Sequence, residues 1–153
     1  MSDFAMLVCS LLLSVHPPAS GIDTAVAIDT CGDVVDVAWS ADVPVALVAA
    51  LAYHESKYDP FAVSRSGALG PLQVLPVYSC PGGRARGCDV VAAGVGALRR
   101  FLVRADWDRS AAVCRYTGCR VTGNTGFVAQ ILATTRWIER SLECQCSTSR
   151  VEN

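Results

Sequence analysis

The chain has 153 residues, which suits one domain with a sizeable buried core. Its hydrophobic content of 52% and its charged content of 18% exclude general disorder. The net charge of −1 argues against a nucleic-acid-binding protein, because such proteins carry a clear basic excess.

The first 21 residues have two interpretations. Residues 4–15 form a largely apolar run, which is too short to span a bilayer but has the length of a signal-peptide core. Ala19, Ser20 and Gly21 follow as a candidate cleavage point, but no basic side chain precedes the run. Residues 1–21 are therefore a removable signal peptide or an N-terminal helix buried against the domain, and we expect no stable membrane span.

The remainder of the chain predicts helices joined by loops. Residues 22–32 lie between turn-forming prolines and glycines and are expected to be a linker. Helices are expected from Asp33 and again from Pro44, whose missing N–H costs nothing in a first turn. The second of these helices is almost wholly apolar over residues 45–53, and Pro60 should end it near residues 56–59.

The C-terminal half continues this pattern. Residues 60–83 are rich in proline and glycine and indicate a long loop, whereas apolar spacing predicts helices over residues 89–105, 108–116 and 126–142. No strand-like alternation is sustained. The sequence therefore predicts a mainly α single domain over residues 33–146 with a long functional loop, and a tail over residues 147–153.

Glu55 is the strongest candidate for chemistry. The other three glutamates lie in the polar C-terminal stretch, whereas Glu55 follows the apolar run of residues 45–53. A carboxyl against apolar walls has a raised pKa because desolvation penalises its charged form, and the negative end of the helix dipole acts in the same direction. Such a group can donate a proton to a leaving oxygen near neutral pH. A surface carboxylate at a helix end is the alternative that this position alone leaves open.

Two short motifs surround Glu55. Residues 54–64 read HESKYDPFAVS, and residues 66–76 read SGALGPLQVLP. Both resemble motifs of the soluble lytic transglycosylase family, relatives of goose-type lysozyme. In that family Glu-Ser ends a helix, and Gly-Ala-x-Gly-Leu-Met-Gln-Val/Ile-x-Pro follows it. The resemblance spans about residues 33–142 and implies a lysozyme-like fold that cuts the glycan strands of peptidoglycan.

The resemblance also implies roles for individual residues. Glu55 matches the catalytic acid and base of the family, and Ser56 matches the serine that positions it. The second motif matches the loop that lines the substrate cleft, with Gly67, Gly70, Leu72 and Gln73. Glycine there lets the backbone approach a ligand closely, although an ordinary turn is the alternative for both glycines. The Gln73 amide is expected to hydrogen-bond the glycan or the catalytic carboxyl.

Two further motifs of the family are less well kept. Ala-Tyr-Asn-x-Gly has its counterpart in residues 112–118, where Tyr116 and Gly118 match with a one-residue gap and Thr117 replaces the asparagine. The Tyr-Val pair that opens the last helix of the family is Phe127-Val128 here, without the tyrosine hydroxyl. Tyr116 and Phe127 are expected to line the substrate site. These departures bear on turnover and product type rather than on the fold.

The implied chemistry uses one carboxyl and needs no metal and no cofactor. The acid protonates the leaving oxygen and then, as a base, draws a proton from the 6-hydroxyl of the muramic sugar, which closes a 1,6-anhydro ring. Ordinary glycosidases use two carboxylates. Asp59 is the first candidate for a second one, but Asp-Pro favours a cap of the helix stop. Asp106 and Asp108 are interpreted as helix-boundary residues.

Eight cysteines in so short a chain favour disulfides and an exported protein, periplasmic or extracellular, with a phage virion as the alternative. A zinc site is not expected, because the C-x-C pair near the C-terminus is too tight and both histidines are distant. Three bridges are expected, although spacing alone does not fix the connectivity: Cys80–Cys88, Cys114–Cys119, and Cys31 with Cys144 or Cys146.

The sequence thus predicts a lytic transglycosylase that cleaves the MurNAc-GlcNAc β-1,4 bond of peptidoglycan strands, its expected partner. A hydrolytic muramidase with the same site is one alternative. Another is a non-catalytic lysozyme-like module that binds glycan or serves a phage tail or a secretion machine. The altered third and fourth motifs favour this last alternative, whereas Glu55 argues against it, because binding alone needs no buried acid.

Overall fold

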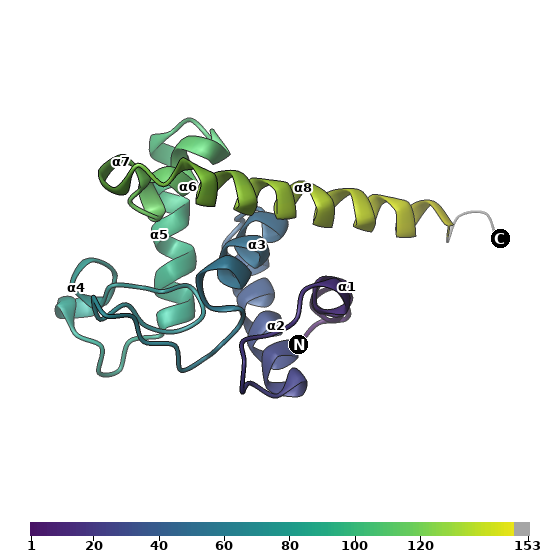
Figure 1. Ribbon diagram of the computed structural model, residues 1–153, viewed down its shortest axis with the longest axis horizontal. Helices are drawn as coiled ribbons and strands as arrows, with labels where there is room; N and C mark the ends of the chain where they lie inside the picture. The colour runs from purple at the N-terminus through teal and green to yellow at the C-terminus, as the bar shows by residue number, and fades with distance from the viewer. Residues whose placement is uncertain (149–153) are drawn as a thin grey trace.

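Helix α3, Val45–Ser56, is the centre of the fold, and its residues from Ala46 to Tyr53 are all buried. An apolar helix of this kind must be covered on every side. Helices α2, Thr24–Ser40, and α8, Thr125–Thr148, pack directly on it, and α5, Val90–Arg104, packs on α2. In this computed structural model, which describes residues 1–148 and their side chains other than 120, 121 and 145–148, α8 crosses the top of the molecule above α3 (Figure 1).

The remaining elements are shorter. The chain between α3 and α5 is a long loop that contains α4, Pro76–Ser79, and a 3₁₀ turn, Pro81–Gly83. Helices α6, Arg109–Tyr116, and α7, Cys119–Thr122, follow α5 along the chain, and α6 packs on both α5 and α8 (Figure 1). The predicted mainly α domain with a long loop is confirmed. Asp89 and Asp108 cap α5 and α6, as each side chain accepts hydrogen bonds from backbone N–H groups of the first turn.

The linker predicted over residues 22–32 is wrong. Helix α2 begins at Thr24, with Asp23 as its N-cap, and places Ala27 and Cys31 in the core. Gly32 lies inside this helix and is buried, with the flexible Met1 side chain next to it. Burial of the apolar face of the helix therefore outweighs the poor helix propensity of this glycine.

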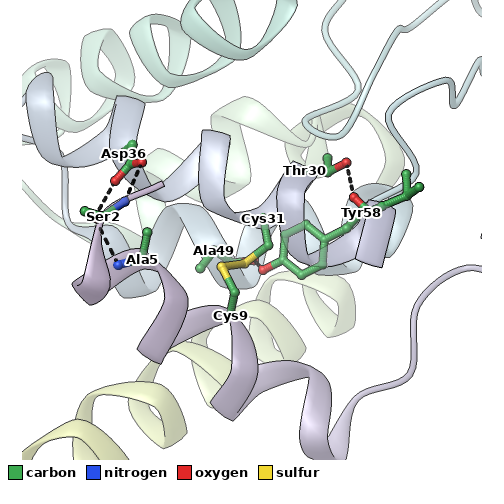
Figure 2. The surroundings of a disulfide bond; sticks show 9 residues. Ser2, Ala5, Cys9, Thr30, Cys31, Asp36, Ala49 and Tyr58 are labelled. Atoms are coloured by element: carbon green, nitrogen blue, oxygen red, sulfur yellow. Dashed lines mark hydrogen bonds between the residues drawn. A yellow bond between two sulfur atoms is a disulfide. The ribbon is translucent and has the colours of Figure 1, made fainter. Parts of the chain in front are cut away.

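The N-terminal segment forms helix α1, Asp3–Val15, which packs on α2 and α8. In the full chain residues 1–21 are thus arranged as in the second interpretation, and their removal as a signal peptide stays a prediction. Cys9 of α1 forms a disulfide with Cys31 of α2, and at the start of α1 the Ser2 hydroxyl donates to Asp36, 2.6 Å away (Figure 2). The predicted pairing of Cys31 with Cys144 or Cys146 is therefore wrong, and the side chain of Cys146 lies outside the described residues.

The other two predicted disulfides are present. Cys80–Cys88 closes the loop that leads into α5, and Cys114–Cys119 joins α6 to α7. Within residues 1–148 no helix combines the length and the apolar character needed to cross a bilayer. The tail predicted from residue 147 lies outside the described residues, apart from the last turn of α8.

Candidate active site

Glu55 is the penultimate residue of α3, and its side chain is only partly exposed. Burial raises the pKa of its carboxyl to about 7, because desolvation penalises the charged form. Within the described part of the chain, no cation pairs with this carboxylate to offset the effect. Glu55 is thus poised between its protonated and ionised forms near neutral pH.

The chain turns sharply after Glu55. Lys57 and Tyr58 both have left-handed backbones, with φ of 52° and 62°. Such a conformation is costly for residues with a Cβ and persists only where the surroundings hold it. Tyr58 provides the anchor: its ring is fully buried and its hydroxyl donates to the Ala49 carbonyl at 2.8 Å (Figure 2). The role of Tyr58 is not visible in the sequence, because a tyrosine two residues before a proline carries no signal of burial.

Ser56 of the first motif and Tyr116 of the third both form hydrogen bonds to the second motif. The Ser56 hydroxyl donates to the Pro71 carbonyl at 2.9 Å and, more weakly, to the Ala52 carbonyl at 3.3 Å. The Tyr116 hydroxyl donates to the adjacent Leu72 carbonyl at 2.7 Å. Burial, and secondarily the charge on Glu55, raise the pKa of Tyr116 far above its usual range. The third motif therefore contacts the second, and Tyr116 lies within the electrostatic reach of Glu55.

The two glycines of the second motif differ. Gly70 has φ of +70° and is buried, and a Cβ there would lie 2.8 Å from a methyl of Val90. Its N–H donates to the Ala62 carbonyl at 2.9 Å, which closes the loop. Gly67 also has a positive φ, +80°, but it is exposed, and a Cβ there would meet no other atom within 4 Å. Gly70 therefore allows a close approach of two segments, whereas Gly67 serves the turn.

Gln73 lies in the same loop with a left-handed backbone, φ 47°. Its amide nitrogen donates to the Gly70 carbonyl at 3.0 Å and to the Ala62 carbonyl at 3.4 Å. The structure therefore does not contain the expected hydrogen bond between the Gln73 amide and the Glu55 carboxyl. Gln73 instead stabilises the loop through these two bonds, and it also lines the neighbouring cavity.

A cavity of about 510 Å³ opens beside this loop. It is bounded by the loop, α4, α5 and the end of α6, and Gln73 and Tyr116 are both in its wall. Glu55 does not line it, and Tyr116 links the cavity to the carboxyl. The full lining is Gln73, Val74, Leu75, Tyr78, Ser79, Ala97, Arg100, Phe101, Arg104, Arg115 and Tyr116.

Phe127 lies away from this cavity. Its ring makes an edge contact with His54, with centroids 6.1 Å apart. His54 in turn hydrogen-bonds Thr134 of α8, with Nε2 and Oγ1 2.9 Å apart. Desolvation, and secondarily the charge of His16, lower the pKa of His54. These residues fasten α8 to α3 next to Glu55.

The aspartates near the motifs have structural partners. Asp59 accepts a hydrogen bond from the Phe61 N–H at 2.8 Å, as expected for a cap of the helix stop. Asp108 caps α6, and Asp106 lies in the turn before it. No group of three or more metal-ligating side chains occurs among the residues that the structure describes.

Leu72 is fully buried against α5, and the residue that permits this is Gly94. A Cβ at Gly94 would lie 2.8 Å from both Cβ and Cδ1 of Leu72 and 3.0 Å from Val74. The role of Gly94 is not visible in the sequence, because a glycine within a helical pattern does not reveal what packs on it.

Gly94→Ala is expected to lower the free energy of unfolding by roughly 1–3 kcal/mol. The added methyl would overpack the contact between α5 and the loop of the second motif, residues 66–76, which we call the motif loop. Gly96→Ala is the matched control on the same helix, where the nearest atom is 3.6 Å away, at the end of the Arg100 side chain. That variant should gain about 0.5–1 kcal/mol from helix propensity. Urea unfolding of both proteins checks the prediction, and two changes of the same sign would contradict it.

The raised pKa of Glu55 makes stability depend on pH. The folded protein retains the proton between about 4.5 and 7, where the unfolded chain releases it, so stability falls as pH rises through this window. The loss amounts to about 3 kcal/mol at most. Glu55→Gln should therefore be more stable than the wild type at pH 8 and lose this advantage at pH 4, as measured by urea unfolding. A difference that is equal at both pH values would show that the carboxyl is not buried as described.

The domain is mainly helical, and its core helix ends at one half-buried glutamate beside a loop that turns at glycines. This arrangement is lysozyme-like. The model of the transglycosylase SLT domain family matches residues 36–118, more than half of the chain, so the protein belongs to this family. No curated protein and no solved structure matches the chain. The family match covers Glu55, the motif loop and Tyr116, and it ends before Phe127.

Proposed function

We propose that this protein is a peptidoglycan lytic transglycosylase that cleaves the β-1,4 bond between MurNAc and GlcNAc. The observation that carries the proposal is the half-buried Glu55 carboxyl, with its pKa raised to about 7. A general acid that must also act as a base works best when its pKa lies near the working pH. A carboxyl with only a structural role would not need this costly position.

Glu55 would act twice in the reaction. Its protonated carboxyl gives a proton to the glycosidic oxygen as the bond to C1 of MurNAc breaks, and GlcNAc leaves with a free hydroxyl. The N-acetyl oxygen of MurNAc stabilises the positive charge at C1. The Glu55 carboxylate then takes the proton of the C6 hydroxyl as that oxygen bonds to C1, which closes the 1,6-anhydro ring and restores the acid. No water is consumed.

The surroundings of Glu55 support a mechanism with a single carboxyl. Asp59 and Asp108 each accept a backbone hydrogen bond as a cap, which gives both carboxylates a structural role. Ser56 and Tyr116 fasten the motif loop through the Pro71 and Leu72 carbonyls. These contacts would fix the loop that receives the glycan relative to the acid, which is how positioning contributes to rate.

The disulfides fit an exported protein. We further propose that it acts in the periplasm or outside the cell, where peptidoglycan lies. A component of a phage virion is the alternative, and its substrate would be the same.

Product analysis tests the proposal. Purified peptidoglycan digested with the protein is expected to release muropeptides that end in 1,6-anhydro-MurNAc, detectable by mass spectrometry as a loss of one water relative to the reducing sugar. Products with reducing MurNAc ends alone would identify a hydrolytic muramidase instead.

A second candidate function is a lysozyme-like module that binds glycan without cutting it. Two observations favour it. Thr117 replaces the asparagine of the third motif and directs its hydroxyl to the Val113 carbonyl at 2.9 Å, within its own helix. Phe127 lacks a hydroxyl and packs on His54. Cell-wall suspensions that bind the protein but lose no turbidity would support this candidate.

A further inference from the structure

Three arginines line the cavity beside Tyr116. Arg100 and Arg104 belong to α5, and Arg115 to α6. Arg100 and Arg104 are four residues apart and so lie on one face of the helix. The lining contains no aspartate or glutamate, and neither of the ion pairs found among the described residues involves these arginines. In a chain with a net charge of −1, this is a local excess of positive charge.

Arg115 is held in place by the backbone. Its guanidinium donates to the Arg104 carbonyl, 3.0 Å away, near the end of α5. A guanidinium has five N–H donors in a planar fork, so this bond leaves donors for a ligand. Arg100 and Arg104 are exposed along the same wall. Guanidinium groups without protein partners are suited to carboxylates, which they bind in a bidentate manner.

The rest of the lining is largely apolar, with Val74, Leu75 and Phe101 among its members. Unmodified N-acetyl sugars carry no charge and would leave the arginines without partners. In peptidoglycan, however, each muramic acid carries a lactyl group extended by a short peptide with aliphatic side chains and free carboxylates. Three residues of such a peptide span about 10 Å. Tyr116 lines the cavity and its hydroxyl donates to the Leu72 carbonyl, next to the Pro71 carbonyl that Ser56, the neighbour of Glu55, contacts.

We propose that this arginine-lined cavity binds the carboxylates of the stem peptide, so that the protein prefers glycan strands that still carry peptides. This inference rests on the proposed function, since it places the sugar beside Glu55. Tyr116 connects the two regions: it lines the cavity, and its hydroxyl contacts the same short segment, Pro71 and Leu72, that Ser56 contacts beside Glu55.

The test compares kcat/KM on peptide-bearing strands with kcat/KM on strands stripped of peptide by an amidase. The wild type should prefer the peptide-bearing strands at low salt. The double substitution Arg100→Gln and Arg104→Gln should reduce this preference about tenfold, as expected for the loss of charge-assisted hydrogen bonds. Arg99→Gln is the matched control, because Arg99 is exposed on the same helix but does not line the cavity. It should retain the preference.

Two outcomes would overturn the inference. One is that the double-substituted protein shows the same preference for peptide-bearing strands as Arg99→Gln. The other is an equal loss on both substrates, because stripped strands retain the lactyl carboxylate and the arginines would then bind that group or the glycan itself. Amidation of the peptide carboxyls gives a third arm, which should abolish the preference in the wild type.

Binding measurements separate this inference from the proposed function. Calorimetry on the Glu55→Gln protein, with and without the arginine substitutions, uses a soluble GlcNAc-MurNAc tetrapeptide and its carboxyl-amidated form. If the wild type cuts nothing but the Glu55→Gln protein binds the tetrapeptide through the arginines, the proposed function fails and the cavity assignment stands. If strands are cut but the arginines do not affect binding, the assignment fails and the function stands.

Discussion

Glu55→Gln is expected to reduce the cleavage of purified peptidoglycan by roughly 10²–10⁴-fold, the contribution of a positioned general acid and base. Glutamine matches the size and shape of the glutamate, but it can neither deliver a proton to the glycosidic oxygen nor accept one from the C6 hydroxyl. Turbidity loss of cell walls and quantification of anhydro ends by mass spectrometry both measure the change.

The pH profile gives a second readout of the same residue. Because the first step needs the protonated acid, kcat/KM of the wild type should fall as pH rises through about 7, the pKa of Glu55. The residual activity of Glu55→Gln should lack this decline. Asp59→Asn is the matched control, since its side-chain oxygen still accepts from the Phe61 N–H, and it should retain most of the activity. If Asp59→Asn loses as much activity as Glu55→Gln, two carboxylates act and the single-acid mechanism is wrong.

The sequence predicted α3, α5, α6 and α8 because their signals are local. Pro44 and Pro60 bracket α3, and the apolar run over residues 45–53 between them indicates a buried helix. Asp89 and Asp108 are caps that act within three residues of their own position. Glu55 was found for a similar reason, because its distinguishing features, an apolar helix before it and a glycine-rich motif after it, are neighbours along the chain.

The parts that sequence analysis missed depend on contacts between distant segments. Cys31 pairs with Cys9 rather than with a C-terminal cysteine, because α1 lies across α2, and no spacing rule reveals that arrangement. Gly94 is needed only because Leu72 approaches it from another element. Each of the three arginines fits an ordinary helical pattern in the sequence. They form a group only in the fold, where α5 and α6 face the motif loop.

The candidate site also combines two features that cost stability. Glu55 holds a partly buried carboxyl with no cationic partner among the described residues, and Lys57 and Tyr58 follow it with left-handed backbones. Strained backbone conformations persist where the surrounding structure holds them in place. The buried Tyr58, with its hydrogen bond to the Ala49 carbonyl, provides such a constraint. The cost of the arrangement is consistent with a functional role for Glu55, since a structural helix end would gain from a solvated or paired carboxylate.

A chain that begins at Ile22 is expected to lose most of its folding stability. Val8 and Leu12 of α1 are fully buried, and each contributes about 1.5–3 kcal/mol by leaving water. The Cys9–Cys31 bridge closes a separation of 22 residues and contributes about 3 kcal/mol more. The sum is comparable with the whole stability of a typical domain of roughly 5–15 kcal/mol. Thermal unfolding followed by circular dichroism should therefore show a much lower Tm or no cooperative transition.

Cys9→Ala in the full chain separates the bridge from the packing. It places no polar group at this buried position and retains the apolar face of α1, so its loss should be limited to about 3 kcal/mol, the contribution of the disulfide. The truncated chain, in contrast, also uncovers the faces of α2 and α8 on which α1 packs, and it should bind a hydrophobic dye that the Cys9→Ala protein does not. If the truncated chain instead unfolds at the wild-type temperature, α1 is dispensable for the fold. Residues 1–21 would then fit the signal-peptide interpretation, and Cys31 of the mature protein would need another partner.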